Sequence, residues 1–159
     1  MYEDAIDAIS NSSKESSVYI GTDSIRYNKK GKWFAKYSTV IILHKDSKHG
    51  CTLFHNSLDL PDYGNIRQRL MSEVGFALEA ATSVLDVLDG RHMEIHLDIN
   101  PNPIHKSNVA VKEALGWVKG TLGIDAKIKP DGFAATHAAD HVVRKPSEFA
   151  SIVAAVVTH

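Results

Sequence analysis

The chain has 159 residues, 43% hydrophobic and 23% charged, which are the proportions of an ordinary globular protein. We expect a single domain over residues 1–159, because this length can bury one sizeable core. The net charge of −1 excludes a uniformly basic protein that coats nucleic acid, although a local basic patch remains compatible with it. An acidic Met1–Asp4 and the lack of an apolar membrane-length run predict a cytoplasmic protein without a membrane partner.

The first part of the chain predicts a helix followed by strands. Residues 1–16 contain a short helix at 3–10 and the start of a polar linker that runs to residue 17. The β-branched and aromatic runs that follow predict strands at 18–22, 34–43 and 51–56. Short turns at 28–32 and 45–50 join them, so these three strands form an antiparallel meander.

After Pro61 the hydrophobic period becomes helical. We expect a long helix at 65–89 that Gly90 ends, and a second helix from Ser107 or Asn108 to Lys119 with Gly120 as its stop. The remaining predicted elements are strands at 91–98 and 125–129, a helix at 132–144 and a C-terminal helix within 146–159. Right-handed crossovers would place both later strands parallel to the first. The predicted architecture is α/β, a five-stranded mixed sheet flanked by helices.

Two of the strand-like runs end in an aspartate, Asp23 and Asp98. A carboxylate at the rim of a buried sheet is costly unless a cation or hydrogen-bond donors offset its charge. If the first and fourth strands are parallel neighbours, both carboxylates emerge at one edge of the sheet. A divalent cation held between them is the simplest explanation.

Further acids belong to the same prediction. Glu73 lies on the sheet-facing flank of the long helix, and Asp140 shares a helix face with His137. Several carboxylates at one edge cannot all stay ionised without cations. Two Mg²⁺ or Mn²⁺ ions would suit their oxygen ligands, activate a water molecule and stabilise the leaving oxygen of a phosphodiester.

Each acid also has a purely structural interpretation. Asp23 could begin a turn, and Asp98 could cap the turn that follows it. Glu73 could be the solvated edge of an amphipathic helix, and Asp140 could form an ordinary i,i+4 pair with Arg144. Their joint placement on two strands and two helices favours the metal site.

Five stretches together resemble the YkuK-type family of predicted ribonuclease H-like nucleases. They are Ile20–Ser24, Glu94–Ile99, Gly116–Gly120, Asp125–Asp131 and Ala135–His141. The resemblance implies the ribonuclease H-like fold, with Asp23, Glu73, Asp98 and Asp140 as metal-binding acids. His137 competes with Asp140 for the fourth position, or serves in proton transfer beside it.

The activity implied is a metal-dependent nuclease that leaves a 3′-hydroxyl and a 5′-phosphate. The alternative is a ribonuclease H-like domain that binds nucleic acid as a scaffold without turnover. A phosphatase or nucleotide-binding protein of another α/β fold is disfavoured, because the chain has no glycine-rich phosphate loop. RNA, DNA and hybrid substrates are not distinguished, and the oligomeric state stays open.

Two groups of basic residues could contact nucleic acid. Lys106, Lys127, Lys129 and Lys145 lie near the predicted active edge, where they could hold phosphates or simply be solvated. The second group is the turn around Lys29, Lys30, Lys32 and Lys36 with Trp33 and Phe34. Its alternative is a solvated turn with Trp33 packed on the sheet. We expect Trp117 to lie in the core.

Overall fold

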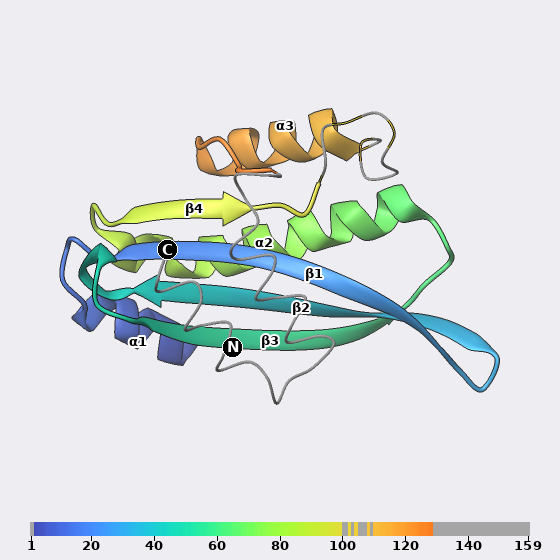
Figure 1. Ribbon diagram of the computed structural model, residues 1–159, viewed down its shortest axis with the longest axis horizontal. Helices are drawn as coiled ribbons and strands as arrows, with labels where there is room; N and C mark the ends of the chain where they lie inside the picture. The colour runs from blue at the N-terminus through green and yellow to red at the C-terminus, as the bar shows by residue number, and fades with distance from the viewer. Residues whose placement is uncertain (1, 100–101, 103, 105–107, 109, 129–159) are drawn as a thin grey trace.

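A mixed four-stranded sheet forms the centre of the computed structural model, which describes residues 2–99, 102, 104, 108 and 110–128 (Figure 1). The strands are β1 (Ser17–Lys29), β2 (Lys32–His44), β3 (Cys51–Pro61) and β4 (His92–His96). Their order across the sheet is β3-β2-β1-β4. β2 pairs antiparallel with β1 and β3, whereas β4 pairs parallel with β1. The predicted meander and the parallel contact between the first and fourth strands are therefore confirmed.

The predicted fifth strand is wrong for the residues that the structure describes. Instead of a strand from Asp125, the chain makes one parallel bridge between Lys127 and His96. The Lys127 amide donates to the Ile95 carbonyl, and the Leu97 amide donates to the Lys127 carbonyl, each at 2.8 Å. The chain leaves the preceding helix by a left-handed turn and reaches β4 only at Lys127, just before the described segment ends.

The hairpin of β1 and β2 is much longer than predicted. The two strands pair without interruption from Ser17 with His44 to Lys29 with Lys32. β4 accompanies β1 only as far as Gly21, so the hairpin projects beyond the parallel pair (Figure 1). Lys30 and Gly31 both have positive φ, 52° and 79°, which matches the tight two-residue turn favoured by the twist of a hairpin.

Two helices cover one face of the sheet, α1 (Glu3–Asn11) and α2 (Ile66–Leu88), and α3 (Val111–Leu122) packs against α2 near β4 (Figure 1). The long helix was predicted almost to the residue, with the Asn65 side chain accepting the Gln68 amide at 3.0 Å. The predicted stop of α3 at Gly120 is wrong, because the left-handed residue that ends it is Gly123. The core between helices and sheet includes Val18, Ile20, Ile41, Leu43, Val74, Ala77, Ala81, Val84 and Ile95.

Buried Arg91 fastens the segment that the sequence predicted as a polar linker. Its guanidinium donates to the carbonyl of Ser10, in the last turn of α1, and to those of Ser12 and Ser13, which follow the helix. The same group donates to the Val87 carbonyl at 2.9 Å and to the Leu88 carbonyl at 3.1 Å, at the end of α2. One cation thereby stabilises the negative ends of two helix dipoles and joins them.

Some predicted elements lie outside the described residues. These are the helices expected at 132–144 and within 146–159. Within the described part of the chain, no helix is long and apolar enough to cross a membrane.

Candidate functional site

Three of the predicted acids belong to neighbouring elements. Asp23 lies in the middle of β1, Glu73 in the second turn of α2, and Asp98 two residues beyond the end of β4. Both Asp23 and Glu73 are buried, with 8% and 7% of their surface exposed. Asp23 therefore does not begin a turn, and Glu73 is not on a solvated helix edge. The Glu73 carboxylate accepts a hydrogen bond from the Ser24 hydroxyl, which ties α2 to β1 beside Asp23.

The charges of these acids act on one another. Burial raises the pKa of Glu73 well above its ordinary value, and the negative charge of Asp23 and then that of Asp98 raise it further. The Ser24 hydrogen bond and the positive charge of Arg69 oppose this rise but do not cancel it. Burial and the neighbouring negative charges therefore favour the protonated form of Glu73, and a nearby cation would favour its ionised form.

The chemistry of the three described acids suits a hard divalent ion, because Asp23, Glu73 and Asp98 offer only carboxylate oxygens as ligand atoms. Across the described residues, no three His, Cys, Asp or Glu side chains are grouped closely enough to hold a metal ion as they stand. Two further predicted site residues, His137 and Asp140, lie outside the described segments. The structure thus brings Asp23 and Asp98 into electrostatic contact with Glu73 without assembling a closed coordination shell.

Ser24 and Arg69 were missed as parts of this region. Ser24 follows Asp23 in the sequence, but its bond to Glu73 depends on how α2 crosses β1. Arg69 lies one helical turn before Glu73, so the i,i+4 spacing was a usable signal. Arg69 also pairs with Asp62 at 3.2 Å, and Asp62 binds Arg26 of β1.

A second polar group on β4 is separate from these acids. The carboxylate of Glu94 lies between two imidazoles, 3.2 Å from Nε2 of His96 and 3.6 Å from Nε2 of His92. The His96 ring also contacts Tyr19, with ring centroids 5.5 Å apart. Burial lowers the pKa of His96, although Glu94 opposes this shift, so the imidazole favours its neutral form. Glu94, His96 and Tyr19 are thus occupied by contacts with one another.

Of the four lysines predicted near the active edge, one is described. Lys127 is exposed beside the end of β4, where its charge helps to lower the pKa of His96. The other three, Lys106, Lys129 and Lys145, lie outside the described residues.

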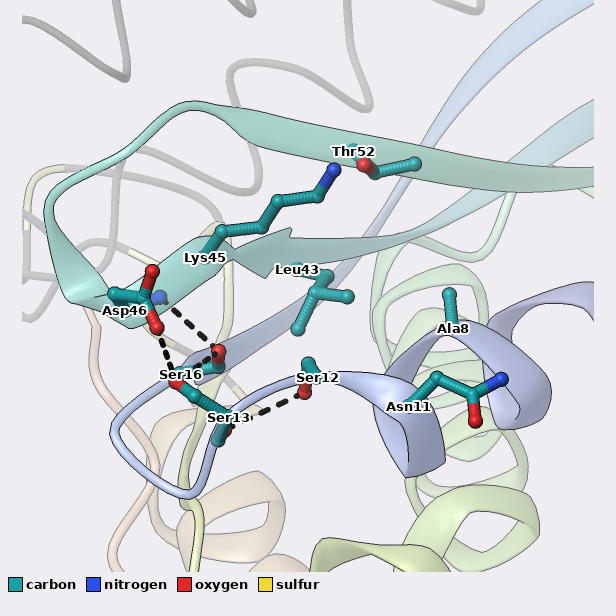
Figure 2. Close-up of a pocket in the computed structure, with 9 residues that line it drawn as sticks. All are labelled: Ala8, Asn11, Ser12, Ser13, Ser16, Leu43, Lys45, Asp46 and Thr52. Carbon is teal, nitrogen blue, oxygen red and sulfur yellow. Dashed lines mark hydrogen bonds between the residues drawn. The ribbon is translucent and has the colours of Figure 1, made fainter.

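A pocket of about 350 Å³ lies at the opposite end of the sheet, where β1 starts and β2 ends (Figure 2). Ser13 donates a hydrogen bond to the Asp46 carboxylate, and the Asp46 amide donates to the Ser16 hydroxyl at 3.0 Å. Because these polar groups bond to each other and lie far along β1 from Asp23, the pocket is not part of the carboxylate site.

Comparison with known proteins agrees with this fold. A model of the ribonuclease H-like family matches residues 1–144. The uncharacterized protein YkuK of Bacillus subtilis (strain 168) is 30% identical over 133 residues, which cover 73% of this chain and 72% of that protein. No solved structure is significantly similar. With Asp23 on β1, Asp98 just after its parallel neighbour β4, and Glu73 on α2, the chain belongs to the ribonuclease H-like family.

Proposed function

We propose that this protein is a metal-dependent nuclease that hydrolyses phosphodiester bonds in nucleic acid. Asp23, Glu73 and Asp98 would hold Mg²⁺ or Mn²⁺, with Asp140 or His137 as the candidate fourth residue. Membership of the ribonuclease H-like family supports nuclease chemistry, while the matched relative is itself uncharacterized. When bound, two divalent ions supply an activated water and charge stabilisation at the leaving oxygen.

The observation that carries the proposal is the environment of Glu73. It is a buried carboxyl group whose pKa is raised by burial and then by the charges of Asp23 and Asp98. Such a group destabilises the fold when it is ionised without a cation, and a purely structural position would be better filled by an uncharged side chain. Mutual repulsion between a buried carboxyl group and two neighbouring carboxylates is expected beside a cation site.

The chain's own residues would prepare this site. The Ser24 hydroxyl fixes one oxygen of Glu73, so that its carboxylate keeps one orientation beside Asp23. Arg69 lowers the cost of ionising Glu73. Asp62 engages Arg69 in an ion pair, which restrains that cation on α2. These contacts hold Glu73 in one position and lower the cost of ionising it.

The test is a cleavage assay with the purified full chain and Mn²⁺ or Mg²⁺. Single-stranded RNA and DNA, their duplexes and an RNA–DNA hybrid form the substrate panel, and the ends of each product are identified. We expect cleavage that leaves 3′-hydroxyl and 5′-phosphate ends. Asp23→Asn and Glu73→Gln should each lower the rate by more than about 100-fold, because even loss of a group that only supports a metal ligand costs 10–100-fold.

Glu79→Gln is the matched control, because Glu79 is exposed on the same helix and the substitution removes the same charge. It should cleave at the wild-type rate. Cleavage that survives Asp23→Asn, or no cleavage of any substrate with either ion, would contradict the proposal and favour a binding scaffold.

A further inference from the structure

The β1–β2 hairpin concentrates positive charge in a chain whose net charge is −1. We call residues 25–36 the basic hairpin. It carries Arg26, Lys29, Lys30, Lys32 and Lys36, and no aspartate or glutamate occurs between Asp23 and Asp46. The basic hairpin therefore carries five of the chain's 18 lysines and arginines and no acidic residue.

The lysines at the tip are available to a partner. Lys29, Lys30 and Lys32 are exposed, and none of them forms an ion pair with another described residue. The tip extends past β3, whose last residue, Pro61, pairs with Phe34. Within the described structure, the three ammonium groups thus face solvent on a ribbon that no other strand borders.

The base of the basic hairpin is held rigidly. The Arg26 guanidinium stacks over the Trp33 ring at 4.1 Å, and Asp62 binds that guanidinium. The Asp62 amide donates to the Trp33 carbonyl at 3.0 Å, and Arg69 of α2 pairs with the Asp62 carboxylate. Trp33 is 45% exposed, so it is not packed on the sheet as its structural alternative required. These contacts connect the basic hairpin to α2, the helix that carries Glu73.

The first strand of the basic hairpin is the continuation of β1 beyond Asp23. Side chains alternate along a strand, so Asp23, Ile25, Tyr27 and Lys29 share one face of β1. On that face Tyr27 stacks against Phe34 with ring centroids 5.7 Å apart. Lys29 is roughly 20 Å from Asp23 at about 3.3 Å per residue, a length of about six base pairs at 3.4 Å each.

From these observations we propose that the basic hairpin binds the sugar–phosphate backbone of a nucleic acid whose adjoining segment lies at Asp23. Exposed lysines supply the charge complementarity, and the partly exposed rings of Tyr27 and Phe34, on the same face as Asp23 and Lys29, supply stacking surfaces. The contact is independent of base sequence. This inference rests on the proposed function, because it assigns the substrate path of that same site.

The experiment measures binding without cleavage. Fluorescence anisotropy of labelled single-stranded and duplex oligonucleotides is recorded in a chelator over a series of salt concentrations, with the full chain and with the triple variant Lys29→Gln, Lys30→Gln, Lys32→Gln. We expect the triple variant to bind at least about tenfold more weakly. Its slope of log affinity against log salt should be smaller by about 2 to 3, since each phosphate contact contributes about 0.9 on duplex and about 0.7 on single strands.

Two controls complete the design. Lys45→Gln, Lys48→Gln, Lys112→Gln removes the same charge from exposed lysines outside the basic hairpin and should bind like the wild type. Replacing Lys29, Lys30 and Lys32 by arginine should preserve both the affinity and the slope. An equal loss of affinity in the basic-hairpin triple variant and in the control triple variant overturns the inference. The absence of binding by the wild type overturns it as well. Because cleavage with Mn²⁺ is assayed separately, either result leaves the nuclease proposal to its own test.

Discussion

At the scale of single residues, Glu73 links stability to pH. Its folded-state pKa is raised from the ordinary value of 4.5, so the folded protein binds this proton more tightly than the unfolded chain does. The associated stability is fully present below that ordinary value and is lost as the pH rises through the folded-state pKa. In chelator, Glu73→Gln should therefore raise the free energy of unfolding increasingly over that window, by up to about 1.4 kcal/mol per pH unit.

Urea unfolding at several pH values measures this effect. Exposed Glu79 provides the control, because Glu79→Gln removes an acidic group from the same helix and should not reproduce the effect of Glu73→Gln. The prediction is contradicted if the stability of the wild type does not change above pH 4.5, or if Glu73→Gln has the same pH dependence as the wild type. Either result would show that folding does not raise the pKa of Glu73.

Arg91 gives a second prediction at this scale. Its guanidinium is 6% exposed and donates to carbonyls at the ends of both α1 and α2. Arg91→Ala should lower the free energy of unfolding by about 3 kcal/mol or more, because several buried acceptors lose their donor at once. Arg91→Lys should recover little of this loss, since the compact lysine ammonium cannot reproduce the directed N–H donors of the planar guanidinium. Chemical denaturation of both variants tests the claim, and full rescue by lysine would contradict it.

At the scale of elements, the glycines of helix α3 have two different effects on stability, one inside the helix and one at its end. Gly116 and Gly120 lie inside the helix with open space where a Cβ would stand, whereas Gly123 ends it with φ at +72°. Gly116→Ala and Gly120→Ala should each stabilise the protein by about 0.5–1 kcal/mol through helix propensity. Gly123→Ala should destabilise it by about 1 kcal/mol, because an L-residue is strained there. Thermal unfolding distinguishes the two outcomes, and equal effects at all three positions would contradict them.

Element boundaries were predictable where a local signal exists. Asn65 caps α2 and a left-handed turn ends it, so both limits could be read from sequence. The hydrophobic signal of β1 stops near Thr22, yet the strand continues to Lys29 because β2 supplies a hydrogen-bonding partner along its whole length. Trp117 was expected in the core but is 42% exposed, since it lies over Gly75 on the outer side of α2. Strand pairing and helix docking decide such features.

At the scale of the whole molecule, a bound cation would join three elements, β1, α2 and the segment after β4. A ligand that binds only the folded state stabilises it by about 2.7 kcal/mol at a concentration 100 times its dissociation constant. We expect Mn²⁺ or Mg²⁺ to raise the melting temperature of the wild type and a chelator to reverse the shift. Asp23→Asn should reduce the shift strongly, while Asp86→Asn, an exposed acid on α2, should keep it. Equal shifts in both variants would place the bound ion elsewhere.

Local periodicity, capping and residue type were sufficient to predict the α/β class, the antiparallel meander and the long helix. Tertiary structure alone decided that Ser24 binds Glu73, that Arg91 joins two helix ends, and that the predicted fifth strand is reduced to one bridge at Lys127. It also decided the length and rigid base of the basic hairpin. These features arise from contacts between residues distant in sequence, and their positions follow from how α2 and β2 pack against β1.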